Sequence, residues 1–253
     1  VAFTGIVMGK LIVENGMPDI VGVIAAVLVG AACGTFNGIM ISKFKLQPMI
    51  ATLAMMSMAR GAAYTLADGQ TITGYSAGFR WIGIANIPGT AIPVQIIFMV
   101  LLYIVFYYVM KYRKFGRYIY SIGGNEEATR LSGINVDKYK TLAYTVSGLC
   151  AGIASVILVA KLNSAQSVAG LDYEMDAIAS CVIGGTSLLG GFGSVWGTFV
   201  GSIIMIVIRN GLNLAGAKND VQYIVIGSVI ILAVTIDVFR NKMEAKARKM
   251  AAQ

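Results

Sequence analysis

The polar side chains with the clearest functional pattern lie between residues 113 and 140. Asn125 can accept a hydrogen bond as the N-cap of a short helix, and Glu126 and Glu127 follow it in the first turn, where the helix dipole favours anions. Gly133 can take the left-handed conformation that ends a helix. A helix of about seven residues is marginal in water, so it needs another surface to lie on. The pattern therefore predicts a capped helix that binds another surface noncovalently.

Ala128, Leu131 and Ile134 would give this helix a small apolar edge, because positions three apart share a helix face. Seven basic residues between positions 111 and 140 place the segment on the cytoplasmic side under the positive-inside rule. We therefore expect a soluble partner in the cytosol to bind or drive helix 126–132.

Covalent chemistry has few candidates in this chain. There is no His, which is the commonest general base and a common metal ligand. Cys33, Cys150 and Cys181 lie far apart in apolar runs without metal-binding spacing, and we interpret them as small buried hydrophobic residues. The glycine cluster GGTSLLGGFGSVWG at 184–197 lacks the lysine of a phosphate loop. We expect no catalytic residue, no metal and no cofactor in this chain, and no ATP hydrolysis by it alone.

The composition is that of a polytopic membrane protein rather than a soluble domain. The chain is 57% hydrophobic and 13% charged, and its mean hydropathy is +0.75. The net charge of +8 does not require a nucleic-acid partner, because basic and acidic residues fall in alternating segments along the chain. Fourteen of the twenty Lys and Arg residues lie in 43–45, 111–140 and 240–249.

The apolar runs predict a multi-pass, all-α helical bundle in one transmembrane domain, 1–253, with a coupling segment at 113–140 and a basic tail at 240–253. The expected spans are part of one at 1–12 and full ones near 20–42, 48–66, 93–110, 141–160, 174–189, 193–212 and 221–239. The segments expected outside are 13–19, 67–92, 161–173 and 213–220. The alternative for 174–189, which is short and ends in glycines, is a broken or re-entrant helix. Because Val1 lies inside an apolar run, we expect the chain to be truncated at its N-terminus.

Glycine spacing suggests close helix packing within the membrane. Two pairs have the small-xxx-small spacing, Gly30 with Gly34 and Gly197 with Gly201. The alternative is that these glycines line a path wide enough for a sugar. GTFNG at 34–38 and GTFVG at 197–201 would run in opposite directions through the membrane, which indicates either an inverted repeat or a chance match.

Charged residues near the membrane are few. Arg60 lies within the expected span 48–66, where a charge either serves a function or satisfies backbone carbonyls and reaches toward the headgroups. Asp176 and Arg209 are expected at span ends, in the interface. No span has a carboxylate near its middle, which disfavours a proton-coupled carrier.

Several ordered blocks resemble one known family over essentially the whole chain. The blocks are PMIATLAMMSMARG at 48–61, GRYIYSIGGNEEATRLSGINV at 116–136, YEMDAIASCVIGGTSLLGG at 173–191, and GTFVG at 197–201 followed by NGLNLAG at 210–216. They resemble the membrane subunits of bacterial ABC importers for monosaccharides, the ribose and galactose permease group.

The resemblance implies a coupling helix that docks in a groove of a separate ATPase, which would bind ATP and magnesium. The corresponding residues here are Gly123, Gly124, Asn125, Glu126, Glu127, Ala128, Arg130, Leu131, Ser132 and Gly133. It also implies a fold like that of the vitamin B12 importer permease, a homodimeric or heterodimeric permease core in the cytoplasmic membrane, and a periplasmic or extracellular sugar-binding protein.

A neutral sugar needs hydroxyl and amide partners in its path rather than charges. The candidate lining residues are Asn37, Thr52, Ser57, Ser180 and Asn210, together with Arg60. The basic residues expected on the outer face, as candidates for docking the binding protein, are Arg80, Lys161 and Lys218. Ribose is the first candidate substrate. The alternatives are a secondary sugar carrier that runs on an ion gradient, and a membrane scaffold without a transport role.

Overall fold

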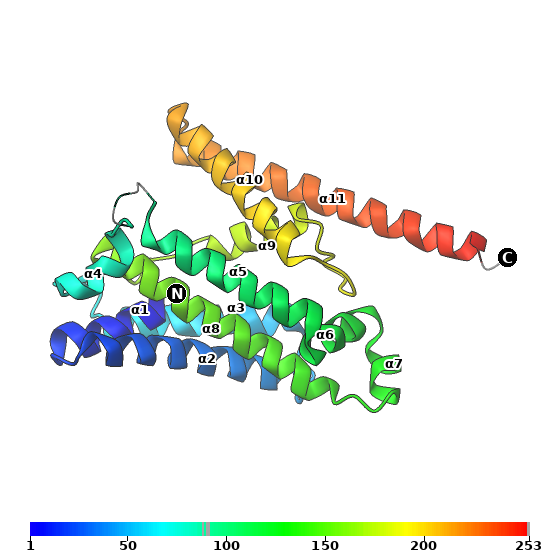
Figure 1. Ribbon diagram of the computed structural model, residues 1–253, viewed down its shortest axis with the longest axis horizontal. Helices are drawn as coiled ribbons and strands as arrows, with labels where there is room; N and C mark the ends of the chain where they lie inside the picture. The colour runs from blue at the N-terminus through cyan, green and yellow to red at the C-terminus, as the bar shows by residue number, and fades with distance from the viewer. Residues whose placement is uncertain (88, 90–91, 252–253) are drawn as a thin grey trace. The chain divides into compact units, whose positions relative to one another are not determined.

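The computed structural model describes residues 1–87, 89 and 92–251, and the chain is almost entirely helical, as predicted (Figure 1). The helices are α1 (Ala2–Gly9), the π-helix η1 (Lys10–Glu14), α2 (Asp19–Ser42), α3 (Pro48–Leu66), α4 (Ala77–Ile84), α5 (Val94–Tyr112), α6 (Lys114–Gly124), α7 (Glu126–Leu131), α8 (Val136–Leu162), α9 (Tyr173–Ile183), α10 (Val195–Leu214) and α11 (Asn219–Ala251). Two short strands, β1 (Ile72–Thr73) and β2 (Ser164–Ala165), pair antiparallel.

By length and composition, five helices among the described residues could cross a membrane, namely α2, α5, α8, α10 and the Asp220–Phe239 part of α11. Each coincides with an expected span. The expected span at 48–66 is a helix of 19 residues, α3, but it does not belong to this most apolar group. Arg60 is partly exposed on it.

The prediction of a full span at 174–189 is wrong, and the broken-helix alternative describes the segment better. Helix α9 has 11 residues, which is about 16 Å at 1.5 Å per residue, against a bilayer core of about 30 Å. Residues 184–194 then form an irregular loop before α10 begins. Gly185, Gly190 and Gly191 have φ of +83°, +89° and +85°, a conformation that ends regular helix.

The chain forms two compact units, and unit 1 comprises Val1–Leu102 and Ser132–Leu171. Helices α2 and α8 run side by side at its centre. A Cβ atom placed on Gly34 would lie 2.2 Å from the Tyr144 carbonyl oxygen, and one on Gly30 would lie 2.4 Å from that of Gly148. Only glycine permits so close an approach of two backbones. The packing interpretation of the first glycine pair is therefore confirmed.

One end of unit 1 gathers the C-terminus of α2 and the N-terminus of α8. The Ser42 and Thr141 hydroxyls are 2.8 Å apart, and Lys45 Nζ lies 2.9 Å from an Asp137 carboxylate oxygen. At the other end of α8, Gly83 of α4 lies against its last turn. Helices α2 and α8 are therefore antiparallel. The basic residues after α2 and those at the start of α8 lie at the same end of unit 1, which agrees with the charge rule.

Unit 2 comprises Tyr103–Leu131 and Asp172–Gln253. Its α9 and α10 are also joined through glycines, because a Cβ atom on Gly201 would lie 2.0 Å from the Ser180 carbonyl oxygen and one on Gly197 would lie 2.0 Å from that of Gly184. Ala179, Met205 and Ile226 form a small core among α9, α10 and α11. The second glycine pair is thus also a packing device.

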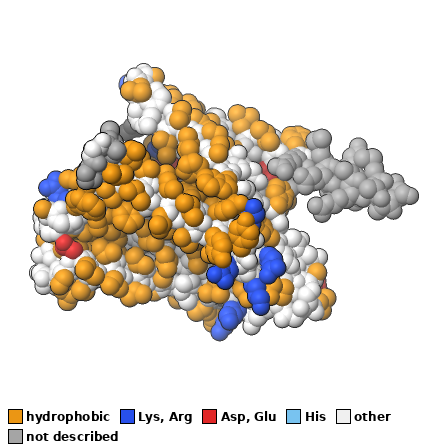
Figure 2. Space-filling view, viewed as in Figure 1, with side chains coloured by type: hydrophobic (Ala, Val, Ile, Leu, Met, Phe, Trp, Pro, Cys, Tyr) orange, Lys and Arg blue, Asp and Glu red, His pale blue; other side chains and the backbone are white. Residues whose placement is uncertain are grey.

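Apolar side chains cover much of the visible surface (Figure 2). Many large ones on the apolar helices are exposed, such as Leu101 at 56% and Ile231 at 69%. Lipid rather than water is the solvent that such a surface requires. The three cysteines are partly buried rather than fully buried, so that prediction holds only in part.

The expected topology can be tested by thiol labelling. Single cysteines at Gly78, on α4, and Lys138, at the start of α8, both lie at exposed positions of unit 1. In a background lacking the three native cysteines, an impermeant thiol reagent should label Gly78→Cys only from outside and Lys138→Cys only from inside. Labelling of both from the same side would contradict the topology.

Candidate functional site

The segment between α5 and α8 contains two helices where the sequence predicted one. Helix α6 was not predicted; within it Gly116 and Ile122 are buried and Arg117 is exposed. It ends at Gly124, after which Asn125 is extended at φ −157° and α7 begins. Gly123 and Gly124 therefore belong to α6, and the docking candidates from Glu126 onward belong to α7 and the turn after it.

The predicted caps of α7 are confirmed. The Asn125 side-chain oxygen accepts a hydrogen bond of 2.9 Å from the Ala128 backbone N–H, as an N-cap should. Gly133 has φ +80°, and Arg130 lies 3.3 Å from Glu126, one turn away. Asn125 and Gly133 thus set the two ends of the helix.

The two faces of α7 differ in what they contact. Thr129 is buried at 3% exposure, and its hydroxyl lies 2.8 Å from both the Asn125 carbonyl oxygen and the Ser121 hydroxyl of α6. Ala128 is exposed, and Leu131 is 84% exposed. The predicted apolar edge therefore faces away from α6, where a partner could reach it.

On another side, α6 contacts the loop between α9 and α10. The Tyr120 hydroxyl donates a hydrogen bond of 3.0 Å to the Gly193 carbonyl oxygen, and a Cβ atom on Gly123 would lie 2.5 Å from the Gly191 nitrogen. Burial raises the pKa of the Tyr120 phenol, so the group keeps the proton that it donates. Sequence reasoning missed Tyr120, and no local pattern marks its distant acceptor.

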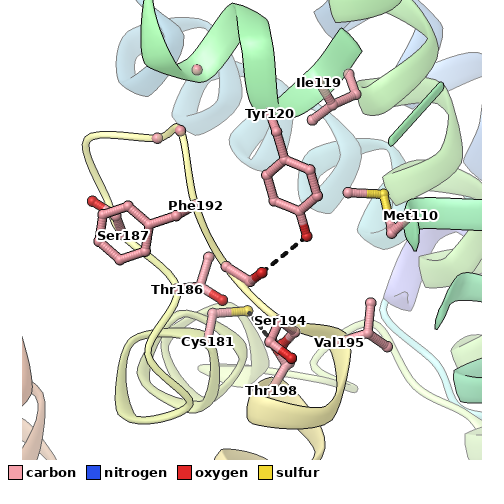
Figure 3. A pocket seen from close by; sticks show the side chains of 14 residues that line it. Met110, Ile119, Tyr120, Cys181, Thr186, Ser187, Phe192, Ser194, Val195 and Thr198 are labelled. Carbon is pink, nitrogen blue, oxygen red and sulfur yellow. Dashed lines mark hydrogen bonds between the residues drawn. The ribbon is translucent and has the colours of Figure 1, made fainter. Parts of the chain in front are cut away.

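A cavity of about 330 Å³ lies beside this contact, within unit 2. Tyr120 points across it from α6 toward the loop, and Cys181 of α9 and Thr198 of α10 lie on the opposite wall (Figure 3). The Thr198 hydroxyl is 3.9 Å from the Cys181 sulfur. Apolar atoms form most of the lining.

The candidate path residues are divided between the two units. Asn37, Thr52, Ser57 and Arg60 lie on α2 and α3 in unit 1, and Ser180 and Asn210 lie on α9 and α10 in unit 2. None of the six lines the cavity just described. Asn37 has a buried side-chain oxygen without a hydrogen-bond partner, whereas the Ser180 hydroxyl donates to the Asp176 carbonyl oxygen at 2.7 Å.

The three basic residues expected on the outer face are likewise divided between the units. Arg80 on α4 and Lys161 on α8 belong to unit 1, where Arg80 is partly exposed and Lys161 exposed, and the exposed Lys218 precedes α11 in unit 2. A separate polar cavity of about 290 Å³ in unit 1 is lined by Glu14, Ala67, Asp68, Gln70, Thr71, Ile72 and Thr73. Arg80 and Lys161 do not line it.

Asp176 and Arg209 form an ion pair that the sequence treated as two separate interfacial charges. Arg209 lies 2.7 Å from one Asp176 carboxylate oxygen and 2.8 Å from the other. The Arg209 side chain is 35% exposed and the Asp176 side chain is 23% exposed. Opposite charges expected at the same membrane face of consecutive segments were the signal that could have identified the pair.

The ion pair should stabilise the packing of α9 on α10. We expect Asp176→Asn and Arg209→Gln each to lower the free energy of unfolding in detergent by about 2 kcal/mol. The double variant should lower it by little more than either single variant. The pair Lys10–Glu14, at 3.2 Å and four residues apart, joins no two helices; it is the control and should couple by only a few tenths of a kcal/mol. Additive losses for Asp176 and Arg209 would show that the pair contributes nothing as a pair.

Metal chemistry has no candidate centre in the described part of the chain. No group of three or more His, Cys, Asp or Glu side chains there could hold a metal ion.

Five described helices that could cross a membrane, with a short capped helix between two of them along the chain, are the features of a multi-pass membrane permease subunit. The chain belongs to the family described as "Branched-chain amino acid transport system / permease component", which matches residues 1–234. It is 44% identical over 240 residues to the ribose import permease protein RbsC of Escherichia coli (strain K12), covering 93% of this chain and 74% of that one.

Two further relatives extend the comparison. The ribose import permease protein RbsC of Bacillus subtilis (strain 168) is 41% identical over 236 residues, covering 92% of this chain and 72% of that one. The D-allose transport system permease protein AlsC of Escherichia coli (strain K12) is 36% identical over 236 residues, covering 93% of this chain and 72% of that one. No solved structure matches the chain.

Proposed function

We propose that this chain is the transmembrane subunit of an ATP-driven importer for a neutral monosaccharide, with ribose as the first candidate. The observation that carries the ATP-driven part is α7, a short capped helix that exposes Ala128 and Leu131. A helix so short has little stability of its own, so its exposed apolar edge is best explained by a partner that binds it. The names of the relatives support a sugar as the substrate.

The subunit itself would carry out no covalent chemistry. A separate ATPase would bind ATP and magnesium and contact α7, and a periplasmic or extracellular binding protein would deliver the sugar to the outer face. Two permease chains, identical or different, would enclose the path. Docking on one side and ATP-driven closure on the other would then bias two states of the helical bundle.

The outer basic residues Arg80, Lys161 and Lys218 remain candidates for docking the binding protein. Charges at the rim of an interface mainly raise the rate of encounter, so these residues would affect loading rather than the path itself. Within the path, Asn37 is the candidate with the most specific structural support, because its buried oxygen lacks a partner.

Three alternatives differ from this proposal in substrate, in energy source or in having no transport activity. The family description names branched-chain amino acids, whereas the three relatives above are named for sugars. A secondary carrier would require an ion gradient instead of ATP. A scaffold would transport nothing.

The test is uptake of labelled ribose by proteoliposomes that contain the complete transporter with its ATPase and binding protein. We expect uptake that requires ATP and persists when ion gradients are dissipated. Unlabelled ribose should compete best, with galactose and xylose weaker and leucine without effect. Failure of ribose to compete would reject ribose, and uptake abolished by an ionophore in the presence of ATP would reject the ATP-driven reading.

A further inference from the structure

The contact between α7 and α6 is partly buried and joins the two helices through side-chain hydroxyls. Thr129 of α7 is 3% exposed, and its hydroxyl lies 2.8 Å from the Ser121 hydroxyl of α6. The same hydroxyl lies 2.8 Å from the carbonyl oxygen of Asn125, the residue between the two helices. Because a buried hydroxyl that loses its partners costs free energy, a displacement of α7 is expected to move the end of α6 with it.

The end of α6 in turn touches the 184–194 loop at two places. Tyr120 donates its hydrogen bond to the Gly193 carbonyl oxygen at 3.0 Å. One turn on, Gly123 meets the loop backbone directly, because a Cβ atom on Gly190 would lie 2.9 Å from the Gly123 Cα and one on Gly123 would lie 2.5 Å from the Gly191 nitrogen. No side chain fits between these backbones, so a shift of Gly123 toward the loop must displace the loop.

The loop is firmly attached to the helices on either side of it. A Cβ atom on Gly184 would lie 2.3 Å from the Gly197 carbonyl oxygen, so α9 and α10 meet backbone to backbone where the loop begins. The Asp176–Arg209 ion pair joins the same two helices farther along. Close-packed backbones transmit a displacement rather than absorb it. Helices α9 and α10 therefore form one stiff hairpin with the loop at its tip.

The cavity beside the contact leaves α6 room to move. Its volume is about 330 Å³, and Met110, Ile119, Phe192 and Val195 contribute to its mainly apolar lining (Figure 3). Apolar walls can slide past each other without breaking directional bonds. The contacts of Tyr120 and Gly123 are therefore the ones that fix the position of the loop relative to α6.

We propose that Tyr120 and Gly123 are positioning residues that transmit movement of α7 to the α9–α10 hairpin through the 184–194 loop. This inference rests on the proposed function, in which a cytosolic ATPase moves α7. The two residues bind neither sugar nor nucleotide. Their role is to convert a displacement at α7 into a displacement of helices inside the membrane.

The test compares Gly123→Ala with Gly227→Ala in the complete transporter, reconstituted with its ATPase and binding protein. A Cβ atom on Gly227, in α11, would meet nothing within 4 Å, so this variant is the control for an added methyl group. In complexes that retain the ATPase, we expect Gly123→Ala to lower the amount of sugar taken up per ATP hydrolysed about tenfold. Gly227→Ala should leave this ratio unchanged.

Tyr120→Phe provides a second variant that removes a single oxygen atom and should fold in any case. Loss of one hydrogen bond predicts a fall of about fivefold in sugar carried per ATP hydrolysed. Tyr223→Phe, on the exposed ring of Tyr223 in α11, is its control and should have no effect.

Cys181 provides a readout of movement that does not depend on transport. Its sulfur lines the cavity, and Cys33 and Cys150 can be replaced by alanine so that it alone reacts. Binding of a non-hydrolysable ATP analogue to the ATPase should change the alkylation rate of Cys181 by about threefold or more when the contact is intact. The same analogue should leave the rate nearly unchanged in Gly123→Ala, although the ATPase is still bound.

Different results would overturn the linkage through Tyr120 and Gly123 and the proposed function. If the unaltered transporter takes up sugar with ATP while Gly123→Ala and Tyr120→Phe match their controls in uptake per ATP and in the Cys181 response, the linkage is wrong and the proposed function stands. If the unaltered transporter shows no ATP-dependent uptake, the proposed function fails and the linkage fails with it.

Discussion

Ala128→Glu is expected to release the ATPase from the membrane subunit and to abolish uptake. Ala128 is exposed on α7, on the same edge as Leu131, which is 84% exposed. A carboxylate placed there would be buried without a partner against the ATPase, which costs several kcal/mol or prevents docking. The measurement is the amount of ATPase that co-purifies with the subunit in detergent, together with sugar uptake. We expect both to fall to background.

The matched control is Ala77→Glu, the same substitution at an exposed position of the segment 67–92, which we expect outside the membrane. It should retain the ATPase, because no cytosolic protein can reach it. Gly133→Val tests the same helix through its backbone, since valine is strained at φ +80° and would loosen the end of α7. If Ala128→Glu still retains the ATPase and supports full uptake, α7 is only a connecting segment.

Gly34→Ala is expected to destabilise unit 1 more than any other single methyl group on α2 apart from one at Gly30, which meets the same helix. The added Cβ atom would lie 2.2 Å from the Tyr144 carbonyl oxygen, and a backbone atom cannot rotate away as a side chain can. Overpacking of this kind typically costs about 1–3 kcal/mol. The measurement is the apparent unfolding temperature in detergent, with insertion into the membrane checked separately.

Gly61→Ala on α3 is the matched control, because a Cβ atom there would meet nothing within 4 Å. In water, alanine is favoured over glycine within a helix by about 0.8–1.0 kcal/mol, so this variant should be neutral or slightly more stable. Equal stability of Gly34→Ala and Gly61→Ala would contradict the close approach of α2 and α8.

Local chemistry explains which features could be predicted. The spans α2, α5, α8, α10 and α11 follow from runs of about twenty apolar residues, because a bilayer requires that length wherever the helix packs. The caps of α7 follow from Asn125 and Gly133, since a cap acts within one turn of its own helix. The expectation of a soluble partner for α7 came from these rules, and its identity as an ATPase came from the resemblance.

The errors have physical causes as well. The apolar run at 174–189 is long enough to suggest a span, but Gly185, Gly190 and Gly191 take conformations that only the surrounding packing selects. Helix α6 lies in a polar segment, and it has a surface to lie on only because Gly123 and Tyr120 meet a loop far along the chain. Asp176 and Arg209 were assigned separately because nothing local joins them.

The sequence by itself determined that this protein is an all-α, multi-pass membrane protein with a short capped helix in its basic segment. Hydropathy, charge distribution and capping decide these features over a few turns of chain, whatever lies beside them. Only the tertiary structure decided that Leu131 faces outward while Thr129 is buried, and that Gly34 and Gly123 lie against particular backbones. The reason is that glycine has no side chain by which to specify a partner, so its role depends entirely on which distant segment the fold brings against it.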